Sequence, residues 1–183
     1  MATITFITGN PDKLRELRDI FPRHLELTHK KLDIDEIQTL DLHEIISHKL
    51  RQAYSVIGKP VIVEDVSAGL ESLDGLPGPF IKFFNQKLGG DALYKIGAPN
   101  DRAVITCTMG YYDGDQEIVV DGVVTGTVVS PRGSSGFGFD IVIQPDGYTQ
   151  TFAEMDPAIK NEISHRGRAA QAMAEALSKR GLK

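Results

Sequence analysis

The chain has 183 residues, of which 41% are hydrophobic and 25% charged, and its formal net charge is -5 at pH 7. These values are typical of a globular protein, and we expect one domain over residues 1–183. The acidic balance argues against a broad nucleic-acid-binding surface, and no apolar run reaches the roughly 20 residues that a membrane span needs. We therefore expect a cytoplasmic protein without a nucleic-acid or membrane partner.

Cys107 is the only cysteine, so no disulfide can form within the chain. A single cysteine fits a reducing compartment. Because Cys107 stands in an apolar run with nothing nearby in the sequence to lower its pKa, we interpret it as a core residue and not as a nucleophile.

Residues 4–13 predict a strand, a tight turn and the start of a helix. Gly9 allows a close backbone approach, and Asn10 and Pro11 favour the first positions of a helix. Thr8 to Lys13 then suit a phosphate, because a helix start carries partial positive charge and Lys13 adds a full one. An ordinary strand-to-helix turn accounts for the same residues, and no Walker loop occurs in the chain.

The next elements are a strand over 25–29, a charged loop or short strand over 31–36 and a helix from Asp41 to Gly58. Asp41 and Glu44 have the spacing of a capping box, and Gly58 favours the helix end. Lys49 lies beside the apolar stripe of this helix.

Val61–Val63 predicts a buried strand that runs into two acids, Glu64 and Asp65. Burial of charge without a partner is costly, and functional groups of open α/β sheets gather at the carboxyl ends of strands. The pair therefore favours a metal or catalytic site.

A rigid loop over 74–79 leads to an expected helix over 80–88 with Lys82 in its first turn. Lysine opposes the helix dipole there, which indicates either a bound anion or a solvated side chain. A short helix over 91–96 follows, and residues 103–112 and 117–129 predict a long hairpin, so the fold is mixed.

The glycine-rich stretch 130–138 precedes an expected strand over 139–143. Phe137 and Phe139 flank Gly138 and form either a slot for a flat base or part of the core. Asp140 could accept a hydrogen bond from a ring N–H.

Two helices are expected at the C-terminal end, one after Asp156 that carries Lys160 and one after Ser164. His165 and Arg166 stand in the first turn of the second helix. Their charge opposes the dipole, which indicates a nearby anion or a solvated cluster.

Together these residues predict a site for a nucleoside triphosphate and Mg²⁺. Carboxylates without clustered cysteine or histidine suit a hard cation, and lysine and arginine suit phosphate oxygens. No pattern of a covalent catalyst occurs, so we expect a water to attack a phosphorus, with one carboxylate on the metal and another orienting the water.

Five separated motifs occur in the order found in the inosine triphosphate pyrophosphatases, and over Ile4 to about Ala170 the chain resembles the eukaryotic type of this family. The motifs are Thr8-Gly9-Asn10 with Lys13, Glu64-Asp65, Gly75-Leu76-Pro77-Gly78-Pro79 with Lys82, Phe137-Gly138-Phe139-Asp140 and Ser164-His165-Arg166.

The resemblance implies an enzyme that hydrolyses ITP, dITP and XTP to the monophosphate and pyrophosphate by attack at the α-phosphorus. It implies Mg²⁺, for which Mn²⁺ can substitute, and a homodimer. The implied fold is α/β, an elongated mixed central sheet flanked by helices, with two lobes and a substrate cleft between them.

The resemblance also implies residue roles. Asp65 and Glu64 are the catalytic candidates, with Asp65 the favoured base, and Glu36 and Asp65 are the metal candidates. The substrate candidates are Thr8, Gly9, Asn10, Lys13, Lys49, Lys82, Phe137, Gly138, Phe139, Asp140, Lys160, His165 and Arg166.

Two positions depart from the family pattern. Val66 stands where a serine or threonine is usual, and Ser67 is expected to point to the opposite face from Val66. Phe139 stands where the eukaryotic type often has tryptophan. A nucleotide-binding protein without efficient catalysis, and an enzyme for a modified pyrimidine nucleotide, are the competing hypotheses.

Overall fold

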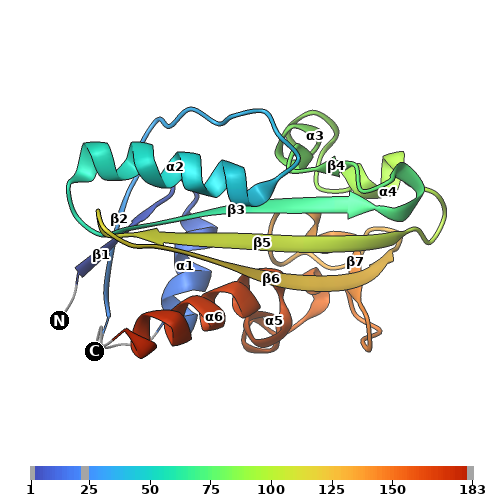
Figure 1. The fold of residues 1–183 in the computed structure, drawn as a ribbon. Helices are drawn as coiled ribbons and strands as arrows, with labels where there is room; N and C mark the ends of the chain where they lie inside the picture. Colours follow the sequence, from blue (N-terminus) through green and yellow to red (C-terminus); the bar gives the residue numbers. More distant parts are fainter. Residues whose placement is uncertain (1–2, 22–24, 181–183) are drawn as a thin grey trace. The chain divides into compact units, whose positions relative to one another are not determined.

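The computed structural model describes residues 3–21 and 25–180. Its sheet has seven strands in the order β2-β1-β3-β5-β6-β7, with β4 paired to β3. Parallel and antiparallel pairs both occur, and helices flank the sheet (Figure 1), so the expected mixed α/β fold is confirmed.

The bounds of the elements are as follows. The strands are β1 Thr3–Ile7, β2 Glu26–Lys30, β3 Val61–Leu70, β4 Pro77–Gly78, β5 Arg102–Tyr112, β6 Glu117–Val128 and β7 Ile143–Pro145. The α-helices are α1 Pro11–Ile20, α2 Leu42–Ile57, α3 Ile81–Leu88, α4 Ala92–Ile96, α5 Pro157–Ile163 and α6 His165–Lys179.

The chain forms two compact units. Unit 1 comprises residues 1–65, 107–122 and 166–183, and unit 2 comprises residues 66–106 and 123–165. In the described part of the chain, no helix combines the length and the apolar character needed to cross a bilayer.

Unit 1 begins with the expected strand, turn and helix. The side chain of Asn10 accepts hydrogen bonds from the backbone N–H groups of Asp12 and Lys13 and so caps α1. Helix α2 begins after Asp41 and ends at Gly58, whose φ of 64° is the left-handed conformation that favours glycine. One half of the expected capping box forms, since the N–H of Glu44 donates to Asp41 Oδ1, whereas the N–H of Asp41 donates to the hydroxyl of Thr39.

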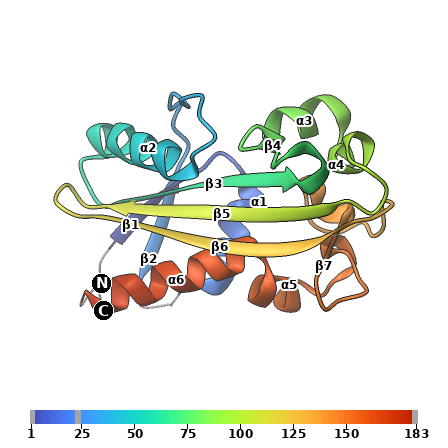
Figure 2. The same ribbon diagram turned by 45° about the vertical axis from the view of Figure 1, so that its right-hand side comes forward.

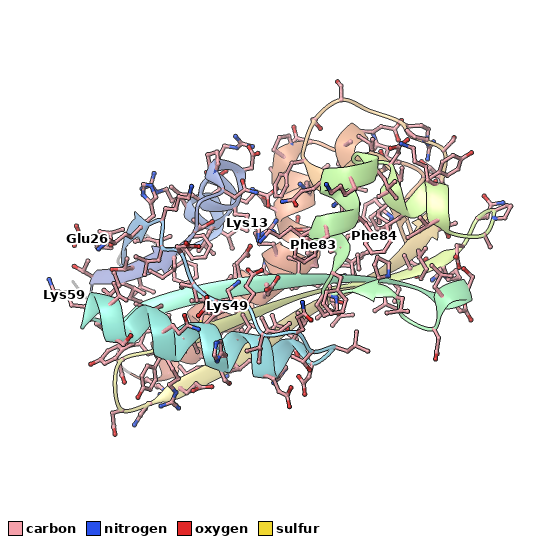
Figure 3. The ribbon with its side chains drawn as sticks, turned by 90° about the horizontal axis from the view of Figure 1, so that it is seen from above. Lys13, Glu26, Lys49, Lys59, Phe83 and Phe84 are labelled. Atoms are coloured by element: carbon pink, nitrogen blue, oxygen red, sulfur yellow. The ribbon has the colours of Figure 1, made fainter. Side chains whose placement is uncertain are left out.

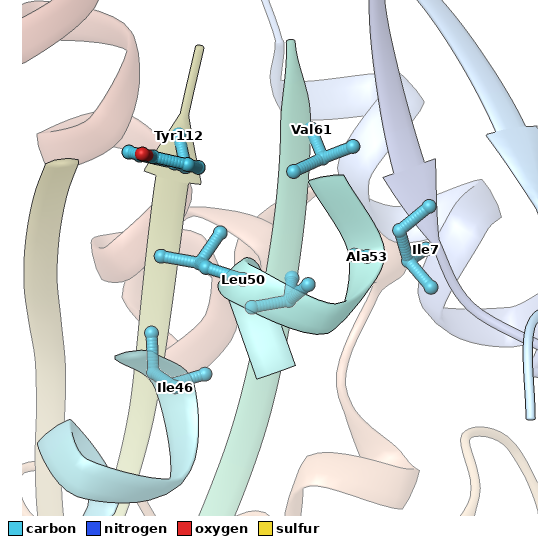
Figure 4. Packing of buried hydrophobic residues seen from close by; sticks show 7 residues of the cluster. Ile7, Ile46, Leu50, Ala53, Val61 and Tyr112 are labelled. Carbon is cyan, nitrogen blue, oxygen red and sulfur yellow. The ribbon is translucent and has the colours of Figure 1, made fainter. Parts of the chain in front are cut away.

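Helix α2 packs its apolar stripe on the sheet of unit 1 (Figure 4). Ile46, Leu50 and Ala53 of α2 contact residues of three strands in one buried cluster, which also contains Ile7, Val61, Val63 and Tyr112. This burial stabilises the position of the whole helix, including Lys49.

Strand β3 is longer than the sequence predicts. It continues to Leu70, so Glu64 and Asp65 lie within the strand and not at its end. The parallel neighbour β1 pairs with β3 only as far as Phe6–Ile62 in register and ends at Ile7. The two acids therefore lie just beyond the carboxyl end of β1, where β3 extends past its neighbour.

Unit 2 contains β4, which pairs with β3 at Ala68 and Gly69, and helices α3 and α4, which pack beside each other (Figure 2). The prediction of a strand over 139–143 is wrong for most of that range. Residues 138–141 form a 3₁₀-helix, and the strand β7 starts only at Ile143. The carboxylate of Asp140 accepts a hydrogen bond from the N–H of Phe137, which closes this turn.

We predict that Leu50→Ala lowers the free energy of unfolding by about 2–5 kcal/mol, because it opens a cavity in the cluster under α2. Urea unfolding followed by circular dichroism measures this change. Val56→Ala is the matched control, since Val56 lies on the same helix with 62% of its surface exposed. A loss as small for Leu50→Ala as for Val56→Ala would contradict the packing described.

Candidate functional site

A buried carboxylate, that of Glu64, joins two cations in unit 1. The ammonium of Lys13 lies 2.7 Å from Glu64 Oε1, and Nε of Arg166 lies 2.8 Å from Glu64 Oε2. Arg166 also contacts Glu16 through its NH1 group at 2.6 Å. Three predicted residues far apart in the sequence therefore meet on the face of β3 toward α1 and α6.

Burial and charge act in opposite directions on Glu64. Burial alone would raise the pKa of Glu64, but the positive charges of Arg166 and Lys13 outweigh it and hold that pKa well below its usual range. Only 1% of the Glu64 side chain is exposed. Glu64 is thus an ionised anchor for two cations, and it is poorly placed to accept a proton from water.

Cys107 lies against the same network. Its thiol donates to Glu64 Oε2 at 3.5 Å, and the residue has no exposed surface. Burial, followed by the negative charge of Glu64, raises the pKa of the Cys107 thiol. A thiol with a raised pKa is a weak nucleophile, so the expected core role fits.

Asp65 belongs to a second network, which it shares with Lys49 and Glu36. The Lys49 ammonium lies 3.2 Å from Asp65 Oδ2, 3.3 Å from Glu36 Oε1 and 3.2 Å from the backbone carbonyl oxygen of Glu64. Burial opposes the charged form of Lys49, but Asp65 and Glu36 outweigh it and raise its pKa. The Asp65 side chain is 21% exposed, so water can reach it.

The turn from Thr8 to Lys13 is held by its own side chains. The hydroxyl of Thr8 accepts from the N–H of Asn10 at 3.1 Å, and Asn10 Oδ1 accepts from the N–H of Asp12 at 2.9 Å. The N–H of Asp12, in the first turn of α1, is therefore already paired within the turn. The turn is already ordered, and Gly9 is exposed with the Lys31 side chain packed over it.

The donor set fits a hard cation. The Lys49 ammonium occupies a position that three oxygen atoms surround, two of them from carboxylates, and such oxygens are the ligands of Mg²⁺. Among the described residues, no three His, Cys, Asp or Glu side chains gather closely enough to hold a metal. Glu36 and Asp65 would hold Mg²⁺ only with further oxygens from water or phosphate.

Unit 2 contains the other predicted substrate residues. The ammonium of Lys160 lies 2.7 Å from Asp140 Oδ2 and 5.2 Å from the centre of the Phe137 ring. Asp140 and Lys160 are both buried, and Phe137 is half-buried. Gly136 has a φ of 75°, and a Cβ there would collide with the Asp140 carboxylate, so the loop can close on Asp140 only with glycine at this position.

His165 lies among aromatic rings of unit 2. Its ring centre is 5.8 Å from that of Phe139 and 6.1 Å from that of Phe152. Phe139 is 7% exposed, so of the two readings of this residue, slot or core, the structure favours the core. Phe137 and Gly138 remain the more accessible candidates for contact with a base.

Arg166 and Lys82 are two further predicted candidates for substrate contact. Arg166 lies in unit 1, where its Nε, NH1 and NH2 groups bond to carboxylates. Lys82 stands in the first turn of α3 with its ammonium 5.9 Å from the Phe83 ring centre (Figure 3 shows Phe83).

Val66, which stands where the family usually has serine or threonine, takes part in the alternation of side chains along β3. Val66 is buried, as Glu64 is, whereas Asp65 and Ser67 are half-buried, which agrees with the expectation that Ser67 and Val66 face opposite ways. Ser67 therefore shares the face of Asp65.

Sequence reasoning missed Glu16, which is buried and pairs with Arg166. The only signal was its place beside Leu14 and Leu17 on the buried side of α1, where a charged residue needs a partner. The partner is 150 residues away in the chain, so no local pattern identifies it.

The fold and the two networks define an α/β protein with a charged site where β3 extends past β1. The Ham1 family model matches residues 4–176, and the chain belongs to this family. The resemblance found in the motifs is thereby confirmed.

Relatives of known name support the same assignment. The chain is 43% identical over 172 residues to the inosine triphosphate pyrophosphatase of Yarrowia lipolytica, an alignment that covers 91% of each chain. The Ham1 protein of Staphylococcus aureus has a similar fold, with a TM-score of 0.83 and 24% identity over 97% of this chain and 99% of that one. A Mycobacterium abscessus nucleoside-triphosphatase / dITP/XTP pyrophosphatase has a TM-score of 0.70 and 26% identity over 93% and 98% of the two chains.

We predict that Glu64→Gln is less stable than the wild type by about 3 kcal/mol at pH 7, because it leaves the buried Arg166 and the partly buried Lys13 without their shared carboxylate. The folded pKa of Glu64 lies below its ordinary value of 4.5. Its stabilising effect is therefore complete above that pH and is lost as the pH falls toward the folded pKa, so the difference shrinks by at most about 1.4 kcal/mol per unit below pH 4.5.

Urea unfolding at pH 7, 5, 4 and 3.5 measures this difference. The exposed Glu162, changed to Gln, is the control and should stay within about 0.5 kcal/mol of the wild type at each pH. A Glu64→Gln deficit that stays constant down to pH 3.5 would show that Glu64 is not held ionised by its neighbours.

Proposed function

We propose that the chain hydrolyses non-standard purine nucleoside triphosphates, ITP, dITP and XTP, to the monophosphate and pyrophosphate, and so removes them from the nucleotide pool. The observation that carries this proposal is the pair of networks on the consecutive residues Glu64 and Asp65. The names of the relatives from Yarrowia lipolytica and Mycobacterium abscessus support the reaction and the substrates.

In this proposal the two networks have different roles. Lys13 and Lys49 bind the phosphates as point charges, and Glu64 holds Lys13 in position through their 2.7 Å contact. The loop from Thr8 to Asn10 supplies an ordered turn at the start of α1, where a phosphate gains from the helix dipole.

Asp65 is the proposed base, and Glu64 is not. The carboxylate of Asp65 is accessible, whereas that of Glu64 is buried and bonded to two cations. Asp65 accepts a proton from a water molecule as the water oxygen attacks the α-phosphorus, and pyrophosphate leaves. Mg²⁺ held by Glu36 and Asp65, with Mn²⁺ as a substitute, would polarise phosphoryl oxygens and promote ionisation of that water.

The base binds among the unit 2 residues in this proposal. Phe137 offers a ring face, and the Asp140–Lys160 pair fixes the loop that carries it. Hypoxanthine and xanthine have a 6-oxo group where adenine has an amino group, so a donor from His165 or a backbone N–H would favour them. Guanine shares the 6-oxo group, and its rejection must depend on the 2-position.

The same resemblance supports a homodimer and a cytoplasmic location, and both remain proposals. A nucleotide-binding protein without catalysis would retain the cationic positions and release no pyrophosphate.

We predict that Asp65→Asn lowers kcat/KM for ITP by at least about 100-fold, because the amide cannot accept the proton. Pyrophosphate release from ITP with Mg²⁺ measures the rate. Asp115→Asn, at an exposed position of the β5–β6 turn, is the matched control and should keep wild-type activity. Retention of activity in Asp65→Asn would remove Asp65 as the base.

Substrate choice is predicted separately. Because a missing buried hydrogen-bond partner costs about 1–3 kcal/mol, kcat/KM for ITP should exceed that for ATP by roughly 5–150-fold. Equal values for ITP and ATP would contradict recognition of the 6-oxo group. Release of inorganic phosphate alone would indicate attack at the γ-phosphorus instead.

A further inference from the structure

The ammonium of Lys49 is held where a metal ion would lie. It is bonded to oxygens of three different residues, Glu36, Glu64 and Asp65, at 3.2–3.3 Å. Only 13% of the Lys49 side chain is exposed, so these oxygens replace most of its water. Two of the three oxygens belong to the carboxylates that the proposed function assigns to the metal.

A divalent cation that binds both carboxylates must displace this ammonium. Two cations cannot share a position between the same oxygens, since their repulsion at a few ångströms is large in a partly buried site. Within the described residues no third carboxylate, histidine or cysteine lies close enough to join the two carboxylates as a metal ligand. A free metal ion therefore gains no further ligand from these side chains that would offset the loss of the Lys49 contacts.

A triphosphate changes this balance. It brings oxygens that can complete the coordination of Mg²⁺, which prefers to bind through one or two carboxylates together with substrate phosphates. It also brings negative charge to which the displaced ammonium can move, because lysine carries its charge on a flexible stem.

We propose that Lys49 is a resident counter-ion of the metal site: it bridges Glu36 and Asp65 until a triphosphate arrives, and it hinders the binding of a divalent cation alone. The metal therefore enters together with the nucleotide. This inference rests on the proposed function, because Glu36 and Asp65 are assigned to the metal there.

The test measures Mn²⁺ binding without any nucleotide, by electron paramagnetic resonance of free Mn²⁺. Lys49→Met should bind Mn²⁺ at least about tenfold more tightly than the wild type, a difference of about 1.4 kcal/mol. Lys59→Met is the matched control, since Lys59 is exposed and lies beyond the end of α2 (Figure 3), and it should bind as the wild type does. Equal or weaker binding by Lys49→Met would overturn the inference.

A second variant checks the ligands. In the Lys49→Met background, Glu36→Gln should return Mn²⁺ binding to the weak wild-type level, because one of the two freed carboxylates is lost. Unchanged tight binding in the double variant would place the Mn²⁺ elsewhere and would overturn the inference.

A third measurement needs no substitution at the site. With lysines labelled by ¹³C reductive methylation, which preserves their charge, the Lys49 signal should shift when Mg²⁺ and inorganic tripolyphosphate are added together. Mg²⁺ alone at the same concentration should leave it in place. An equal shift with Mg²⁺ alone would overturn the inference even if Lys49→Met failed to fold.

These readouts are independent of hydrolysis. Tighter Mn²⁺ binding by Lys49→Met, together with a wild type that does not cleave ITP, would support the counter-ion and contradict the proposed function. ITP cleavage by a wild type whose Mn²⁺ affinity equals that of Lys49→Met would contradict the counter-ion alone.

Discussion

The ion pair network around the buried Glu64 carboxylate is the interaction on which the charged part of unit 1 depends. It joins α1, β3 and α6 through Lys13 and Arg166, and Glu16 completes it. A buried carboxylate without partners would cost several kcal/mol, so each of these groups requires the others. The same bonds fix the position of Lys13, which the proposed function requires to be in place before a triphosphate binds.

Two neighbouring residues of β3, Glu64 and Asp65, thus have different surroundings. Because side chains alternate along β3, Glu64 faces α1 and α6 while Asp65 reaches Lys49 on α2. The carboxylate of Glu64 is buried and is held in its charged form by its neighbours, whereas that of Asp65 is accessible. In the proposed function this difference of environment separates a structural acid, Glu64, from the reactive acid, Asp65. Two adjacent letters in the sequence do not make that distinction.

Local physics made much of the fold predictable. The strand, turn and helix at 4–20 and the limits of α2 follow from caps and glycines within a few residues of each other. The length of β3 could not be predicted in this way, because it depends on pairing with β4, whose residues come later in the chain. The 3₁₀-helix over 138–141 likewise depends on Asp140, whose carboxylate bonds to Phe137 and to the distant Lys160.

The sequence predicted which charged residues belong to the candidate site, but not which of them form ion pairs with each other. Charges that oppose a helix dipole indicated either an anion near Arg166 or a solvated cluster, and the structure shows two internal anions, Glu64 and Glu16. Sequence spacing could not distinguish these internal partners from a bound phosphate, since the partners are 102 and 150 residues away.

The central claim is that this prearranged network binds a triphosphate beside Asp65. A crystal structure with Mg²⁺ and an ITP analogue whose α,β-bridging oxygen is a methylene group tests it most directly. The account predicts phosphate oxygens in contact with Lys13, the Lys13–Glu64 pair intact, and an ordered water between Asp65 and the α-phosphorus. A triphosphate bound away from Lys13, or a Glu64 carboxylate that has left Lys13 and Arg166, would contradict it.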